Sequence, residues 1–110
     1  MNDQEIYRTY SAQFRLLDDE LDDLVRRAEN YAQAQAIMDA WKQSNLNLLK
    51  ARNQCFSAGG DQVQSMVKAY TEANQAIKNG LSSLKKGETT LAKVLDLISE
   101  GVARGSDALG

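Results

Sequence analysis

The stretch Ala58-Gly59-Gly60-Asp61 divides the chain into two arms, and both arms are rich in residues that favour helices. A pair of glycines can take the left-handed backbone conformation that ends a helix. The carboxylate of Asp61 can cap the next helix by accepting hydrogen bonds from its first backbone N–H groups. The sequence therefore predicts a chain reversal at residues 58–61.

The arm before this turn contains neither glycine nor proline between Asn2 and Ser57. Its apolar residues recur in alternating steps of three and four, which is the repeat of a coiled-coil helix. This repeat predicts one long helix over about residues 3–57, or two helices with a bend near Asn30 or within Ser44-Asn45-Leu46-Asn47. The residues that carry the repeat are Tyr7, Tyr10, Phe14, Leu17, Leu21, Leu24, Ala28 and Tyr31.

The arm after the turn shows the same spacing over about residues 61–103, from Val63 to Val102. Only Asn74 and Glu88 interrupt its apolar seam. A polar residue at a seam position can fix the register of neighbouring helices. A local rotation that moves Asn74 or Glu88 out of the seam is the alternative.

Two glycines lie inside the second arm, and the stretch Lys85-Lys86-Gly87 is typical of a helix end. The hydrophobic phase nevertheless continues across both Gly80 and Gly87. The sequence therefore favours a continuous or slightly bent helix, at a cost of about 1 kcal/mol for each interior glycine. The glycine-containing tail, residues 104–110, is expected to fray.

Folding the two arms together predicts an all-α protein, a long antiparallel helical hairpin in a single domain. The short turn would bring Met38 beside Leu81. A hairpin covers Ile37, Trp41 and Leu48 poorly, and burying such side chains is worth about 1.5–3 kcal/mol each. We therefore expect two hairpins to pair as a homodimeric four-helix bundle, with these three residues in the oligomer interface.

An alternative arrangement breaks the chain near Asn30, Gly59 and Gly87 into four helices of ordinary length. These helices would pack into a compact monomeric four-helix bundle. This arrangement needs no second copy of the chain to cover its apolar faces.

Two clusters on the first arm are candidates for binding a protein partner. The arm would be about 80 Å long against about 65 Å for the second, at 1.5 Å per residue, which leaves the apolar cluster near its start without a covering helix. A run of acidic residues follows, and like charges at i and i+4 favour a basic partner or a solvated surface. The cluster near the start is Ile6, Tyr7, Tyr10 and Phe14, and the acidic candidates are Asp18, Asp19, Asp22 and Asp23.

Composition excludes several classes of chemistry. The 110-residue chain has no histidine, so it cannot supply a Ser/His or Cys/His nucleophile pair. Its single cysteine, Cys55, cannot close an intrachain disulfide or assemble a cysteine-based zinc site. We predict a protein that is not an enzyme and that has no catalytic residue, cofactor or metal ligand.

The charge pattern and hydropathy restrict partners and location. The net charge is −2 with no concentrated basic face, which argues against nucleic acid as a partner. The longest apolar stretches are far shorter than the roughly 20 residues that span a bilayer, and the polar start lacks a signal-peptide core. A cytoplasmic location without a membrane span is therefore expected.

These observations favour a non-enzymatic protein–protein interaction module that acts through packing of helix faces. The alternative is a structural subunit or chaperone of a larger helical assembly, such as a secretion or phage apparatus. The sequence does not identify the partner.

Overall fold

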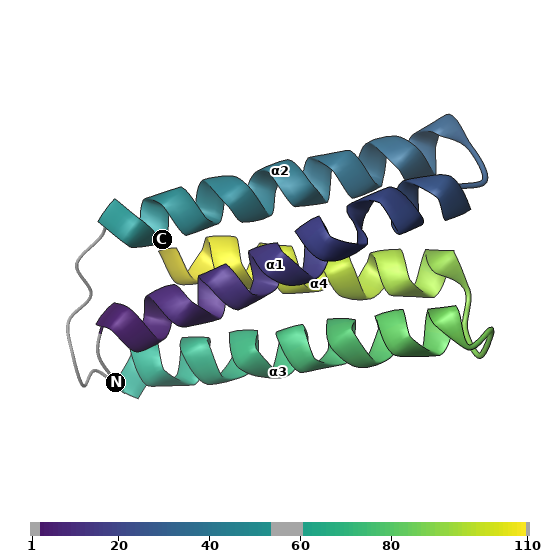
Figure 1. The fold of residues 1–110 in the computed structure, drawn as a ribbon. Coiled ribbons are helices and arrows are strands. Elements are labelled where there is room, and N and C mark those ends of the chain that lie inside the picture. The colour runs from purple at the N-terminus through teal and green to yellow at the C-terminus, as the bar shows by residue number, and fades with distance from the viewer. Residues whose placement is uncertain (1–2, 54–60, 110) are drawn as a thin grey trace.

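The computed structural model describes residues 3–53 and 61–109, and this part of the chain forms four helices with no strand (Figure 1). They are α1 (Asp3–Arg27), α2 (Tyr31–Asn53), α3 (Asp61–Lys85) and α4 (Leu91–Leu109). The helices run alternately up and down in a bundle of 43 × 23 × 18 Å. The prediction of an all-α four-helix bundle is confirmed, and one chain supplies all four helices.

The first arm is divided near Asn30, which agrees with one of the two predicted alternatives, whereas the prediction of a continuous second arm is wrong. The chain leaves the helix at residues 28–30, where Asn30 caps α2. The side chain of Asn30 accepts a hydrogen bond of 2.9 Å from the backbone N–H of Gln33, and the side chain of Gln33 accepts one of 2.8 Å from the N–H of Glu29. Asn30 is therefore the N-cap of α2, and the Gln33 side chain folds back onto the residue that precedes the cap.

The second break lies at Gly87, whose φ of 73° is in the left-handed region. The N–H of Gly87 bonds the carbonyl of Leu84, and the N–H of Glu88 bonds the carbonyl of Ser83, which together form a Schellman motif. The hydroxyl of Thr90 then accepts a hydrogen bond from the N–H of Lys93 and caps α4. Glu88 leaves the seam because it lies in this connection, where it is exposed.

The C-terminal segment is also more ordered than predicted, because α4 continues to Leu109. Gly101 and Gly105 are buried, and both allow a close approach by neighbouring side chains. A Cβ atom at Gly101 would lie 2.6 Å from Cδ1 of Ile77, and one at Gly105 would lie 3.0 Å from the ring of Tyr70. These glycines serve helix packing instead of ending the helix.

Two hairpins, α1–α2 and α3–α4, pack against each other with helices of the same direction as neighbours (Figure 1). Helix α1 contacts α3, and α2 contacts α4. Helices α2 and α3 lie on opposite corners of the bundle and make no contact in the described part of the chain. The predicted proximity of Met38 and Leu81 is therefore wrong. The expected turn residues 58–60 and Cys55 lie outside the described residues.

The core consists of two apolar clusters with a polar layer between them. One cluster lies toward the end where α1 begins and is built from Ile6, Tyr10, Ala51, Val67 and Tyr70. The larger cluster occupies the other end and includes Leu17, Leu24, Ile37, Ile77, Leu81, Leu84, Leu91, Val94, Ile98 and Val102. The buried polar side chains of the described residues are Gln13, Ser44, Asn47 and Asn74, and each lies between the two clusters along its helix.

Candidate functional site

Part of the polar layer joins α1 to α3 through hydrogen bonds. Nε2 of Gln13 donates to Oδ1 of Asn74 over 3.1 Å, and the hydroxyl of Tyr70 donates to Oε1 of Gln13 over 2.8 Å. Asn74 in turn donates to the backbone carbonyl of Thr9. These hydrogen bonds fix the register of α1 against α3, and no buried side-chain polar atom of the described residues lacks a partner.

Tyr10 and Tyr70 form the aromatic part of this layer. Their ring centroids are 4.7 Å apart, and the hydroxyl of Tyr10 donates a 2.6 Å hydrogen bond to the carbonyl of Gly105. Burial raises the pKa of Tyr10 to about 12. Burial, and secondly the neighbouring Tyr10, raise the pKa of Tyr70 well above its usual range. Both phenols are therefore neutral at physiological pH and act as hydrogen-bond donors.

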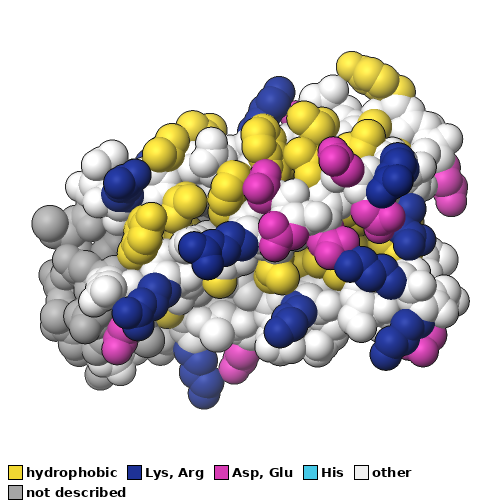
Figure 2. All heavy atoms as spheres, in the orientation of Figure 1, with side chains coloured by type: hydrophobic (Ala, Val, Ile, Leu, Met, Phe, Trp, Pro, Cys, Tyr) yellow, Lys and Arg dark blue, Asp and Glu magenta, His cyan; other side chains and the backbone are white. Residues whose placement is uncertain are grey.

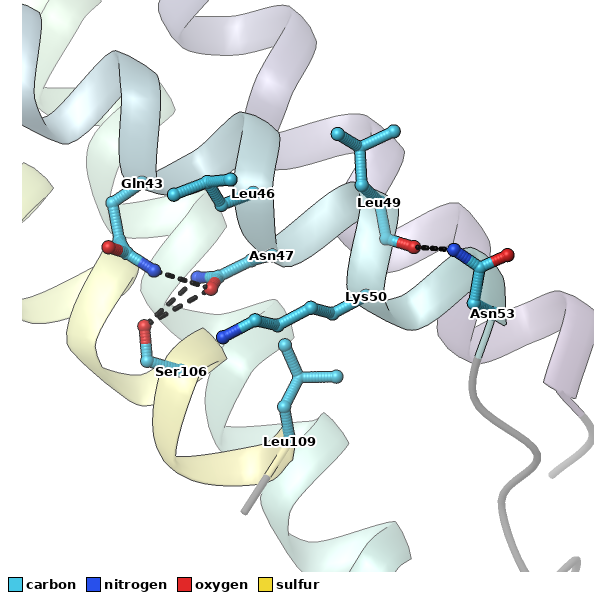
Figure 3. Close-up of a pocket in the computed structure, with 8 residues that line it drawn as sticks. All are labelled: Gln43, Leu46, Asn47, Leu49, Lys50, Asn53, Ser106 and Leu109. Carbon is cyan, nitrogen blue, oxygen red and sulfur yellow. Dashed lines mark hydrogen bonds between the residues drawn. The ribbon is translucent and has the colours of Figure 1, made fainter.

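A second polar network opens to solvent in a groove between α2 and α4 (Figure 3). Asn47 donates to the hydroxyl of Ser106 over 3.1 Å and to the carbonyl of Val102, and its Oδ1 accepts from Gln43. The figure shows Gln43, Asn47 and Ser106 converging at the floor of the groove, with Lys50 beside Leu109. This network ties α2 to α4 as the Gln13 network ties α1 to α3.

Helix α2 presents apolar side chains on the side that faces solvent. Leu46 is 49% exposed and Leu49 is 45% exposed, whereas Ser44 and Asn47 are each 1% exposed. We call the solvent-facing stripe of Gln35, Asp39, Lys42, Leu46 and Leu49 the outer face of α2, because their spacing of three and four places them on one side of the helix. The usual pattern, with apolar residues inward and polar residues outward, is inverted over this turn of the helix.

The predicted cluster at the start of the first arm is mostly covered by the chain itself. Ile6 and Tyr10 are each 1% exposed and belong to the smaller core cluster. Tyr7 and Phe14 are half-buried, and the Phe14 ring lies 6.0 Å from that of Trp41. The expectation that this cluster lacks a covering helix is wrong, because the second break in the chain brings α4 back along the bundle and α3 packs beside α1.

The acidic run lies on the outside of α1, and two of its four candidate residues already have partners. Asp18 accepts a 3.0 Å hydrogen bond from Nε1 of Trp41. Asp23 pairs with Arg27 at 2.8 Å, and this hydrogen bond holds the pKa of Asp23 below its usual range. The neighbouring Glu20 pairs with Lys85 of α3. Asp19 and Asp22 are exposed and make no ion pair within the described part of the chain.

The residues predicted for the oligomer interface contribute to packing within one chain. Ile37 is buried in the larger core cluster. Trp41 packs against that cluster and Leu48 against the smaller one, and both are half-buried. Ile37 is therefore not available to a second copy, since α1 and α4 cover it.

Within residues 3–53 and 61–109, no three cysteine or carboxylate side chains gather where they could hold a metal ion. None of the four described helices is both long enough and apolar enough to cross a membrane. No protein-family model, curated protein or solved structure matches the chain.

The sequence analysis did not predict the outer face of α2 as a candidate site. The sequence contains a signal for it, because residues 34–56 carry apolar side chains on both sides of the helix.

Proposed function

We propose that this chain is a non-enzymatic protein–protein interaction module that docks through the outer face of α2. The observation that carries the proposal is the exposure of Leu46 and Leu49 beside the buried Ser44 and Asn47. Figure 2 shows apolar side chains gathered along α2 and at its junction with α1. Covering a leucine that is half exposed contributes about 1 kcal/mol to binding.

The occupant that fits this face is a second copy of the chain, because the charges and sizes on it are self-complementary. Antiparallel pairing of two α2 helices about an axis between Asp39 and Lys42 places Asp39 opposite Lys42 of the second copy. The same axis places Leu49 opposite the small residue Ala32, and Leu46 opposite Gln35. All six side chains are exposed or half-buried. Each contact occurs twice, as a two-fold interface requires.

This dimer differs from the one that the sequence predicts. The predicted interface used Ile37, Trp41 and Leu48, which pack within one chain in the structure. The interface proposed here lies on the opposite side of α2. A cytoplasmic location remains part of the proposal, supported by the single cysteine of the sequence.

The test is a charge exchange followed by sedimentation equilibrium. Asp39→Lys and Lys42→Asp should each raise the dimer dissociation constant about tenfold, because each places like charges opposite one another twice. The double variant Asp39→Lys/Lys42→Asp should restore the wild-type constant. Asp96→Lys, a charge reversal on an exposed residue of α4, is the matched control and should have no effect.

A wild-type chain that sediments as a monomer at every concentration would overturn the dimer. If the double variant dimerises as weakly as the single variants, the outer face of α2 is not the dimer interface. Growth beyond a dimer as concentration rises would favour the alternative, a structural subunit of a larger helical assembly.

A further inference from the structure

A second groove lies between α1 and α3, away from the outer face of α2, and has a volume of about 510 Å³. The hydrogen bonds from Asn74 to Thr9 and from Gln13 to Asn74 fix how far the two helices are shifted along each other. Because α1 and α3 run in the same direction, this register sets Arg15 level with Lys78. We call this site the α1–α3 groove.

Three cations line the groove, and none has an ion-pair partner within the described residues. Arg8 and Arg15 come from α1 and Lys78 comes from α3, and all three are exposed. Arg26, Arg27, Lys85 and Arg104 pair with carboxylates. Other lysines and arginines are also unpaired, but Arg8, Arg15 and Lys78 line one groove together. Asp19 is the one acidic residue that lines the groove, so the local balance is positive although the whole chain carries −2. Figure 2 shows Lys and Arg side chains over α1 and α3 on this face.

On the α1 side, the groove has an apolar residue between the two arginines, Ala12, and a second one next to Arg15, Leu16. The amide of Asn74 is already occupied by Gln13 and Thr9. The groove follows the middle of two helices, whose backbone N–H groups are engaged in helical hydrogen bonds. A phosphate site normally uses free N–H groups at a helix N-terminus, so this arrangement favours a ligand with carboxylates at its edge and apolar side chains at its centre.

We propose that the α1–α3 groove binds an acidic amphipathic helix of a partner protein. Arg8 and Arg15 are seven residues apart, about 10.5 Å along a helix. Carboxylates at positions i and i+7 of the bound helix match this spacing, with an apolar residue between them against Ala12. Lys78 holds the carboxylate beside Arg15 from the other side. Bringing a negative charge between Arg15 and Lys78 relieves the repulsion of two like charges across the groove.

The experiment measures fluorescence anisotropy of a labelled 18-residue peptide with the full chain. The peptide carries glutamates at i, i+7 and i+14 and leucines between them on the same helical face. A second peptide of identical composition places the glutamates on the opposite face from the leucines. The first peptide should bind at least tenfold tighter, and its affinity should fall as salt rises.

The variant Arg8→Gln/Arg15→Gln/Lys78→Gln should lower the affinity for the first peptide about tenfold, which is about 1.4 kcal/mol. The matched control Lys68→Gln/Lys86→Gln/Lys93→Gln removes the same net charge from exposed residues outside the groove and should change the affinity less than twofold. If circular dichroism shows that the triple groove variant is unfolded, Arg15→Gln alone should still weaken binding measurably.

Equal losses in the two triple variants, or equal affinity for the two peptides, would overturn the proposal because either result means diffuse charge attraction. Tighter binding of tripolyphosphate or polyuridylate than of the first peptide would also overturn it, in favour of a phosphate ligand. The groove is separate from the outer face of α2, so the dimer proposal stands or fails independently of these results.

Discussion

The backbone of Gly105 lies directly against the ring of Tyr70. A Cβ atom at Gly105 would come within 3.0 Å of Cζ and 3.1 Å of Cε2 and the hydroxyl oxygen of Tyr70. The ring is held from two other sides, by Tyr10 at 4.7 Å between centroids and by the hydrogen bond from the Tyr70 hydroxyl to Gln13. The contact therefore requires glycine, although the backbone of Gly105 is helical.

Gly105→Ala should lower the free energy of unfolding by up to about 2 kcal/mol. Overpacking a core typically costs about 1–3 kcal/mol, and the better helix propensity of alanine returns about 1 kcal/mol. Urea unfolding followed by circular dichroism measures the change. Gly80→Ala is the control, because its closest contact is Cδ1 of Leu97, the free end of a half-buried side chain. Gly80→Ala should be neutral or stabilising, and equal losses at both positions would contradict the packing described here.

Gln13→Leu should destabilise the bundle by about 2 kcal/mol or more. The substitution leaves the Tyr70 hydroxyl and Oδ1 of Asn74 buried without their partner, and each such group costs about 1–3 kcal/mol. Gln64→Leu, on the exposed side of α3, should change stability little.

A double-mutant cycle with Asn74→Leu tests the pairing directly. The double variant should lose less stability than the two single variants together, with a coupling of about 0.5–3 kcal/mol. Additive losses would mean that Gln13 and Asn74 contribute separately.

Stability should fall as pH rises above 10. Burial raises the pKa of Tyr10 to about 12, so between pH 10 and 12 the unfolded chain releases this phenolic proton while the folded chain keeps it. The stability that the buried Tyr10 phenol contributes is fully present below pH 10 and is lost as pH rises. The free energy of unfolding should fall by at most about 1.4 kcal/mol per pH unit for this one proton. Urea midpoints of the wild type and Tyr10→Phe across this range measure it. The Phe variant should show the shallower decline, and parallel curves would refute the assignment.

The helical class and the apolar seams follow from the sequence because the spacing of three and four is strong in both arms. The two breaks between helices, at residues 28–30 and at Gly87, are harder to predict from the sequence. A bend near Asn30, whose side chain caps α2, is one of the predicted alternatives, but the uninterrupted run of helix formers is equally compatible with one long helix. At Gly87 the hydrophobic phase continues across the connection, although the chain turns back there. Periodicity shows which residues face a core and does not show how many helices share it.

The functional surface could be predicted less well, because exposure depends on which helices are neighbours. The cluster around Tyr10 would be uncovered in a hairpin and is covered in the bundle. Leu46 would be taken for a core residue by its chemistry, yet Asn47 occupies the inward position because it bonds Ser106 of α4. Sequence alone gives no means of pairing Asn47 with a residue 59 positions away.

The diagonal placement of α2 and α3 also bears on the order in which the molecule assembles. The contacts within α1–α2 and within α3–α4 join segments that follow each other in the chain, so their closure is entropically inexpensive. The contacts that unite the two hairpins, including Gln13 with Asn74, span 61 residues. We therefore expect each hairpin to form early. The hydrogen bonds among Gln13, Asn74 and Tyr70 should form last, because they require the correct register between the two hairpins.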